Sequence, residues 1–187
     1  MYWKQVDKRR KDNSDYREQN KEYFNFKLRE RTEIYNLLPN DFWWKSLDEV
    51  FEWFYNKCSL TGSSKNITID HFIPITWGHG GTYRGNLIVL DMEINKSKGQ
   101  HNPFEWIKKD INKNRINTDK FNELVHNLAT INGLTYEEFK QYVYWCEKNK
   151  REVEQIKNDG KKSSLDLWKE SLITKAIIYL KIFGGDY

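Results

Sequence analysis

The spacing of apolar residues predicts helices over most of the chain. In residues 1–38 an apolar stripe recurs at helical spacing and ends before Pro39. Its members are Tyr16, Tyr23, Phe24, Leu28, Tyr35 and Leu38. Because the segment is also dense in charge, it predicts either a solvated helix that packs one stripe on the body or a basic arm that lies on a phosphate backbone.

Capping residues predict where further helices begin. They are Ser46, Asn102, Thr135 and Ser163. Ser46 and Thr135 are followed three residues later by Glu49 and Glu138, which is the pattern of a capping box. Asn102 stands before a proline, a residue favoured at the first position of a helix.

The segments after these caps have apolar faces of helical period. Residues 118–131 predict a helix, and the face that begins after Thr135 is expected to continue to Val153. The last predicted helix follows Ser163 and has a broad apolar stripe. The members of this stripe are Leu165, Trp168, Leu172, Ala176, Tyr179 and Phe183.

The middle of the chain has a different pattern. Residues 66–71 alternate like a strand, and residues 87–90 form a short apolar run typical of a buried strand. Residues 72–84 between them contain a proline and three glycines, which predict a loop. Residues 91–98 predict a short helix that stops at Gly99. The predicted fold class is therefore α+β, a mostly helical chain that carries a strand–loop–strand–helix insert.

The composition narrows the class of protein. With 8 Trp, 11 Tyr and 10 Phe among 187 residues, disorder throughout is excluded. No apolar run approaches the roughly 20 residues of a membrane-spanning helix, and the N-terminus lacks the apolar region of a signal peptide. We therefore expect a cytoplasmic protein with no membrane partner. The net charge of +4 and the pI near 8.8 are compatible with a nucleic-acid partner.

Four residues of the insert carry the candidate chemistry. Asp70 and His71 end the first strand, Asn86 precedes the second strand, and Asn95 lies one turn into the short helix. A hairpin that folds back and a helix that packs across it can bring these side chains together. The oxygens of Asp70 and Asn95 suit Mg²⁺ or Mn²⁺, and a neutral imidazole suits a general base near pH 7.

The insert resembles the HNH, or ββα-metal, endonuclease family over about residues 55–106. The resemblance lies in the segments Cys58–Gly62, Ile69–Pro74, Gly78–Gly81, Gly85–Leu90 and Asn95–Gly99. It implies a ββα-metal motif at about residues 66–99, with His71 as the base that activates water. It also implies that Asp70 and Asn95 bind one divalent metal and that Asn86 holds the loop and the orientation of His71.

The sequence departs from many relatives in two respects. Asn95 stands where the family signature often has a histidine, which makes this an H-N-N variant. Cys58 and Cys146 form no Cys-x-x-Cys pair, so the structural zinc of many relatives is not expected and the insert must be held by packing. The resemblance implies Mg²⁺ or Mn²⁺ as the cofactor.

Basic residues near the motif predict contacts with double-stranded DNA. The candidates are Arg84, Lys96, Lys98, Lys108 and Lys109. Phosphate contacts give affinity without sequence readout, and the alternative for these residues is a solvated helix face. His79 lies in the glycine loop and is a further candidate for contact with the phosphate or the metal. Trp77 and Tyr83 could stack on bases or plug the loop onto the body.

The sequence thus predicts a metal-dependent DNA endonuclease that leaves 5′-phosphate and 3′-hydroxyl ends, as the resemblance implies, in a bacterium or a phage-infected cell. The alternative is a catalytically inactive HNH-fold module for DNA binding or assembly. A homodimer would supply two active sites if the product is a double-strand break. The expected segments are a charged arm (1–45), a nuclease core (46–115) and a helical C-terminal region (116–187).

Overall fold

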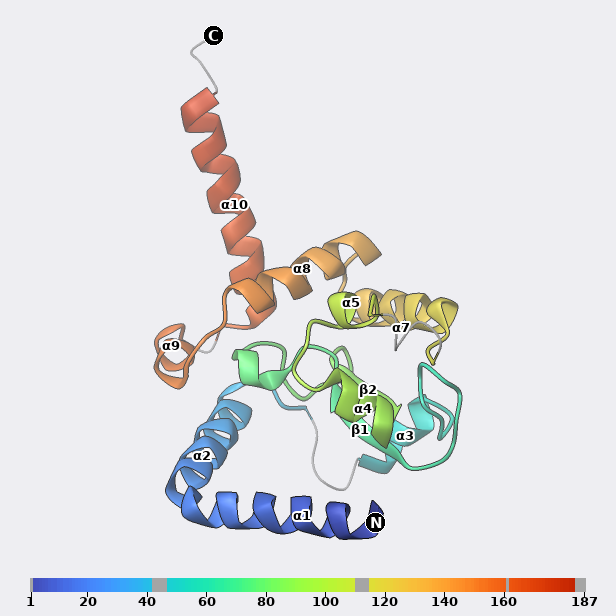
Figure 1. The fold of residues 1–187 in the computed structure, drawn as a ribbon. Coiled ribbons are helices and arrows are strands. Elements are labelled where there is room, and N and C mark those ends of the chain that lie inside the picture. Colours follow the sequence, from blue (N-terminus) through green and yellow to red (C-terminus); the bar gives the residue numbers. More distant parts are fainter. Residues whose placement is uncertain (1, 42–46, 110–114, 161, 184–187) are drawn as a thin grey trace. The chain divides into compact units, whose positions relative to one another are not determined.

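The computed structural model describes residues 2–41, 47–109, 115–160 and 162–183, with side chains from residue 11 to residue 182 within these ranges. The chain divides into two compact units, Met1–Glu33 and Ile34–Tyr187. It is mostly helical with one small antiparallel sheet, which confirms the α+β class. The helices are α1 (Tyr2–Gln19), α2 (Lys21–Leu37), α3 (Leu47–Trp53), α4 (Met92–Lys98), α5 (Pro103–Trp106), α7 (Thr118–Ile131), α8 (Tyr136–Lys148), α9 (Val153–Asn158) and α10 (Ser164–Phe183) (Figure 1).

The predicted single helix over residues 1–38 is wrong at one point, because α1 and α2 are separated at Asn20. The side-chain amide of Asn20 donates to the carbonyl oxygen of Tyr16 at 2.8 Å. Such local side-chain bonds compete with regular helix, which is why asparagine is a poor residue for a helix interior. Tyr23 and Phe26, on α2 in the first unit, are more than half exposed.

The predicted hairpin and helix are present in the second unit. Strand β1 (Ile67–His71) pairs antiparallel with β2 (Leu87–Asp91), and His71 stands opposite Leu87. Helix α4 follows β2 directly, because the Asp91 side chain caps it by accepting from the Ile94 amide at 2.9 Å. Helix α4 packs against both strands (Figure 1).

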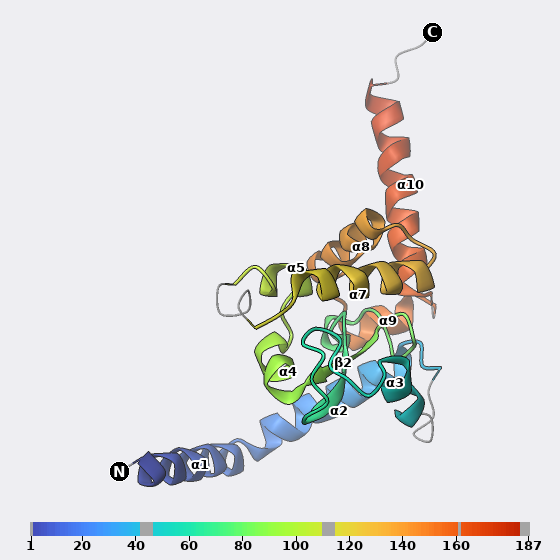
Figure 2. The same cartoon turned by 90° about the vertical axis from the view of Figure 1, so that its right-hand side faces the viewer.

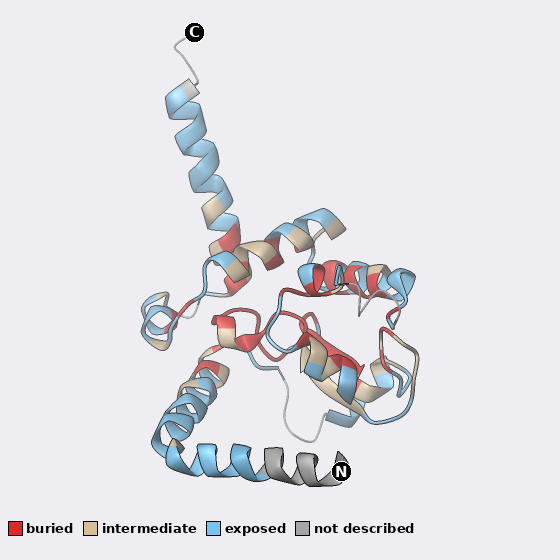
Figure 3. Ribbon diagram, viewed as in Figure 1, coloured by how far each residue is buried: buried red, intermediate tan, exposed pale blue. Residues whose placement is uncertain are grey.

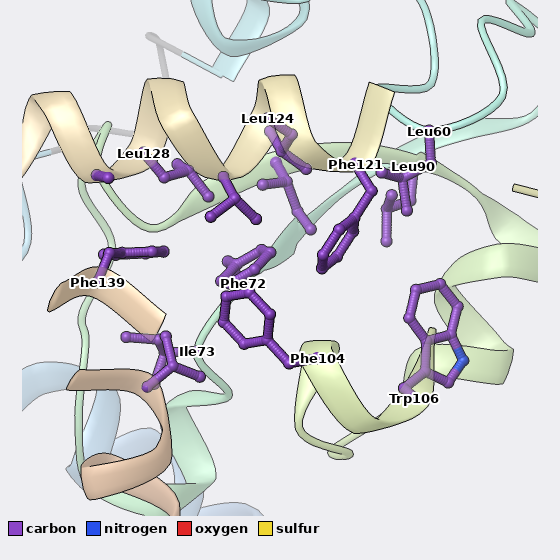
Figure 4. Close-up of a cluster of buried hydrophobic side chains, with 14 of the residues drawn as sticks. Leu60, Phe72, Ile73, Leu90, Phe104, Trp106, Phe121, Leu124, Leu128 and Phe139 are labelled. Atoms are coloured by element: carbon purple, nitrogen blue, oxygen red, sulfur yellow. The ribbon is translucent and has the colours of Figure 1, made fainter. Parts of the chain in front are cut away.

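The main core lies between the hairpin and the C-terminal helices. Helices α7 and α8 pack side by side in both views (Figure 1, Figure 2). Phe72, the residue after β1, contacts the rings of Phe104, Phe121 and Phe139 with centroids 5.7–6.2 Å apart (Figure 4). These three rings come from α5, α7 and α8. The chain just beyond the predicted catalytic pair is therefore anchored on three helices.

The other face of the hairpin packs against α3. Val50 of α3 forms a buried cluster with Leu87 and Val89 of β2, and Ile67 and Ile69 of β1 join it. Alternate residues of a strand point to opposite faces. His71 therefore belongs to the α3 face and Asp70 to the face that meets α4.

The helix starts were predicted well and two helix faces were not. Asn102, Thr135 and Ser163 make the expected capping bonds, whereas Ser46 lies outside the described residues. Helix α8 ends at Lys148, so the expected continuation to Val153 is wrong. The apolar stripe of α10 is buried at Trp168, but most of its apolar side chains from Leu172 onward are exposed (Figure 3).

None of the helices in the described part of the chain combines the length and apolar character that crossing a membrane requires.

The compact units have bounds that differ from the expected segment limits at residues 45 and 115. Ile34 and Leu38 form a buried cluster with Ile75 and Ile156, so the end of α2 belongs to the second unit. The main core also draws buried side chains from both sides of residue 115. The strand–loop–strand–helix insert and the C-terminal helices therefore share one core.

Candidate active site

Asp70 is tied to helix α4 by a buried lysine. Lys98 Nζ lies 2.7 Å from Asp70 Oδ2 and 2.7 Å from the carbonyl oxygen of His71. The Lys98 side chain is 1% exposed, so the prediction that it contacts DNA is wrong. Burial lowers the pKa of Lys98, and the Asp70 carboxylate opposes this shift. The ammonium therefore serves to join β1 and α4.

The Lys98 contact joins the two elements that carry the predicted metal ligands. Asn95 lies three residues before Lys98 and so on the same face of α4, the face that reaches Asp70. Asn95 is half-buried. Among the described residues, no protein group hydrogen-bonds its side-chain amide or Oδ1 of Asp70.

These two oxygens fit a hard divalent cation. Mg²⁺ is usually held by one or two protein oxygens and keeps several waters, which matches one carboxylate and one amide in a half-exposed position. Within the described parts of the chain, no group of three His, Cys, Asp or Glu residues could hold a metal ion. A metal at this site would therefore depend on Asp70, Asn95 and water.

His71 is half-buried at the end of β1. Its Nε2 lies 2.9 Å from Oγ1 of Thr82, a buried residue of the glycine loop. The backbone of Thr82 is held in turn, because its amide donates to Pro39 at 2.8 Å and its carbonyl accepts from Asp41 at 3.1 Å. Thr82 has no signature in the sequence, since its role depends on how the loop returns to β1.

Asn86 is fully buried and holds the loop between the strands. Its Oδ1 accepts from the Ile73 amide at 2.7 Å, and its Nδ2 donates to the carbonyl oxygens of Ile73 at 3.1 Å and Gly81 at 2.9 Å. Gly80 has a φ of +73°, and a Cβ there would lie 2.5 Å from Asn86 Nδ2. Glycine is thus required both by the backbone conformation and by the close approach of Asn86.

His79 is buried in the body, so its expected contact with the phosphate or metal is wrong. Nε2 donates to the Asn149 carbonyl oxygen at 2.6 Å, and Nδ1 accepts from Ser164 Oγ at 3.0 Å. Arg151 donates to Ser164 and twice to the Gly78 carbonyl oxygen. Burial lowers the pKa of His79 to about 4, and the Arg151 charge acts in the same direction. This network anchors the loop through groups far along the chain, which sequence spacing could not reveal.

The remaining predicted DNA contacts lie on the surface. Lys96 pairs with Glu93 at 3.0 Å and Lys108 with Glu105 at 2.6 Å. Lys109 is exposed. The Arg84 guanidinium lies 4.8 Å from the centre of the Trp53 ring and is exposed. These groups can reach a phosphate backbone, unlike Lys98.

Two loop aromatics take the structural role that was weighed for them. Trp77 is 2% exposed and belongs to the main core. Tyr83 donates from its hydroxyl to Asn132 Oδ1 at 2.8 Å and is partly buried. Both side chains therefore fix the loop to the body.

Comparisons with models of protein families, with curated proteins and with solved structures gave no match to this chain. The function is therefore inferred from the residues and the geometry of the chain itself.

Proposed function

We propose that the protein is a metal-dependent endonuclease of the HNH type that hydrolyses phosphodiester bonds in double-stranded DNA. The observation that supports this is the meeting of β1 and α4 through Lys98 and Asp70. This contact joins the helix of Asn95 to the strand that ends in Asp70 and the half-buried His71. Among the described residues, neither Asp70 Oδ1 nor the Asn95 side chain has a protein hydrogen bond. Base, cation ligands and nearby surface lysines are the parts that phosphodiester hydrolysis needs.

Three residues of the chain would have direct roles in the reaction. His71 accepts a proton from the attacking water, and Asp70 and Asn95 hold the divalent cation. The cation, when bound, supplies Lewis-acid stabilisation of charge on the phosphate and leaving oxygen. The resemblance to HNH endonucleases implies products with 5′-phosphate and 3′-hydroxyl ends.

Surface cations would bind the DNA backbone. Arg84 and Lys96 flank the motif, and Lys108 and Lys109 follow it. Contacts of this kind give affinity that is independent of sequence and sensitive to salt. Two copies of the site would be needed to cut both strands in one encounter, which is how a homodimer would contribute.

The test is cleavage of a supercoiled plasmid by the purified chain with Mg²⁺, with Mn²⁺ and with EDTA. The proposal predicts nicked or linear product with either metal and none with EDTA. Sequencing the ends of the product determines their chemistry and the cleavage position. Cleavage that persists unchanged in EDTA would contradict a metal-dependent mechanism.

A catalytically inactive DNA-binding module is the second candidate, and the Lys98 ammonium favours it. This cation already occupies Asp70 Oδ2, where it opposes a second positive charge nearby. Salt-dependent binding of DNA without cleavage at any metal concentration would support this candidate over the enzyme.

A further inference from the structure

The second half of helix α10 exposes apolar side chains over most of its surface. The first turns pack on the body, where Ser164 and Trp168 are buried. Residues 172–182 are all exposed, and this half extends away from the other helices of its unit (Figure 1, Figure 2). A helix that is apolar over most of its surface is normally buried against another element. The large aliphatic side chains of this half are 40–65% exposed, and they are Leu172, Ile173, Ile177, Ile178, Leu180 and Ile182.

A stripe on this surface has the spacing by which helices pair. Ile173, Ala176 and Leu180 recur at intervals of three and four residues, as the a and d positions of a heptad do. Leu172 and Ile177 flank the stripe on either side. Because Ala176 is the smallest member, a second helix can approach closely at the middle of the stripe. The stripe therefore fits a helix with an apolar face of its own.

We propose that α10 pairs with α10 of a second copy of the chain, with the two helices antiparallel and crossing at Ala176. The partner is thus a helix with the same apolar stripe, and the pair has twofold symmetry. The inference stands apart from the proposed nuclease function, because α10 holds none of the candidate catalytic or metal-binding residues.

The distribution of charge favours a second copy in the antiparallel orientation. Residues 172–182 include Lys175 and Lys181 and no acidic residue. In a parallel pair each lysine would lie level with its own copy. In an antiparallel pair that crosses at Ala176, Lys181 lies within one residue of the level of Glu170 of the second copy. Glu170 bonds Lys162 of its own chain at the surface, and its carboxylate keeps lone pairs for a second cation.

The place where α10 meets the body favours the same orientation. The body surrounds only the first turns of the helix, near Trp168. A parallel pair would bring both bodies to one level, although paired helix axes are only about 8–10 Å apart. An antiparallel pair places the two bodies at opposite ends and aligns the helix dipoles favourably.

The exposed apolar area matches a weak but specific dimer. Each copy can contribute several hundred Å² from residues 172–182, so a pair would bury on the order of 1,000 Å² in total, the lower end for a specific interface. We therefore expect a Kd in the micromolar range.

Sedimentation equilibrium of the full chain measures the association, over about 1–100 μM to bracket a micromolar Kd. The wild type is expected to pass from 22.7 kDa toward twice that mass as the concentration rises. Ile173→Glu combined with Leu180→Glu is expected to raise Kd by about 100-fold or more, because it places charges within the apolar stripe. The control is Ile131→Glu, which makes the same change at an exposed isoleucine at the end of α7 and should leave Kd unchanged.

Circular dichroism verifies that these variants fold, which is expected because the replaced side chains are exposed. A wild type that stays at 22.7 kDa at every concentration would overturn the proposal. So would a folded double variant that dimerises as the wild type does. Flotation of a monomeric wild type with vesicles of phosphatidylcholine and phosphatidylglycerol would also overturn it and assign the apolar surface to lipid.

Disulfide cross-linking with copper phenanthroline tests the orientation. The native cysteines, Cys58 and Cys146, are buried. Ala176→Cys is expected to link two copies, because residue 176 lies beside its equivalent at the crossing. Leu180→Cys is expected not to link, because antiparallel helices separate the two residues 180 by about 12 Å along the axis. Rapid linking of Leu180→Cys, or none of Ala176→Cys in a dimeric sample, would overturn the antiparallel pairing.

Discussion

Lys98 and Asp70 form an asymmetric ion pair in which only the cation is fully buried. The Lys98 side chain is 1% exposed and the Asp70 side chain is 21% exposed, with 2.7 Å between Nζ and Oδ2. Water can hydrate the carboxylate if the lysine is removed, whereas the ammonium has no access to water if the aspartate is removed. The two halves of the pair should therefore respond differently to substitution.

Asp70→Ala is expected to lower the free energy of unfolding by about 3 kcal/mol, because it leaves a buried ammonium without its counter-charge. Lys98→Met is expected to change it by less than about 1 kcal/mol, since an apolar chain of similar length fills the same space. Urea denaturation measures both values. Equal losses in the two variants would contradict the asymmetry.

Asn95→Ala is expected to weaken the binding of Mn²⁺ or Mg²⁺ by about tenfold, because it removes one of the few protein oxygens at the site. The folded structure should be retained, since no described protein group hydrogen-bonds the side-chain amide of Asn95. Isothermal titration with Mn²⁺ measures the affinity, and Asn127→Ala on the exposed face of α7 is the control. Unchanged affinity in Asn95→Ala would show that the ligand assignment is wrong.

The sequence predicted the local elements of the site because their signals are local. The alternating run before His71, the helical segment 91–98 and its stop at Gly99 are set by neighbouring residues, and the structure has these elements at nearly the predicted bounds. The pairing of Asn86 with the loop also follows from the resemblance to a known motif. Such short-range patterns determine backbone conformation directly.

The errors arise where the decisive contact is distant in the chain. Lys98 and His79 looked exposed in sequence, since lysine and a loop histidine usually are. Lys98 is buried where it pairs with Asp70, which lies 28 residues earlier on β1. His79 is buried where it hydrogen-bonds partners that lie 70 and 85 residues later in the chain. Thr82 could not be identified for the same reason. The apolar stripe of α10 was expected from its helical spacing, yet most of it is exposed, because spacing alone does not determine which part of the chain covers an apolar face.

Acid should weaken the fold through His79. Its pKa is lowered to about 4 in the folded chain, against about 6.5 unfolded, so between these values the unfolded chain binds more protons. The free energy of unfolding should therefore rise with pH across this window, by up to about 3 kcal/mol in total. Stability is fully retained above pH 6.5 and is lost progressively toward pH 4.

Urea denaturation from pH 4 to pH 7 measures the effect. His79→Gln, which has no titrating ring, is expected to remove most of the pH dependence in this window. The same slope in His79→Gln and wild type would show that other groups are responsible.

Lys109→Ala should reduce the salt dependence of DNA binding by roughly one unit of log–log slope if Lys109 contacts a phosphate. Lys108→Ala should reduce it less, because the Glu105 carboxylate already compensates the Lys108 charge. Binding titrations between low and physiological salt measure both slopes. An unchanged slope in Lys109→Ala would identify a solvated surface residue, and a shifted cleavage position would indicate base readout.

The most direct test of the nuclease assignment is the single-turnover cleavage rate of His71→Ala in saturating Mg²⁺. His126→Ala, a histidine on the exposed face of α7, is the matched control. Loss of the general base is expected to slow cleavage by about 10²–10⁴-fold while DNA affinity and thermal stability stay near the wild-type values. A wild-type cleavage rate in His71→Ala would contradict the account, because no other described histidine lies at the end of β1 beside Asp70.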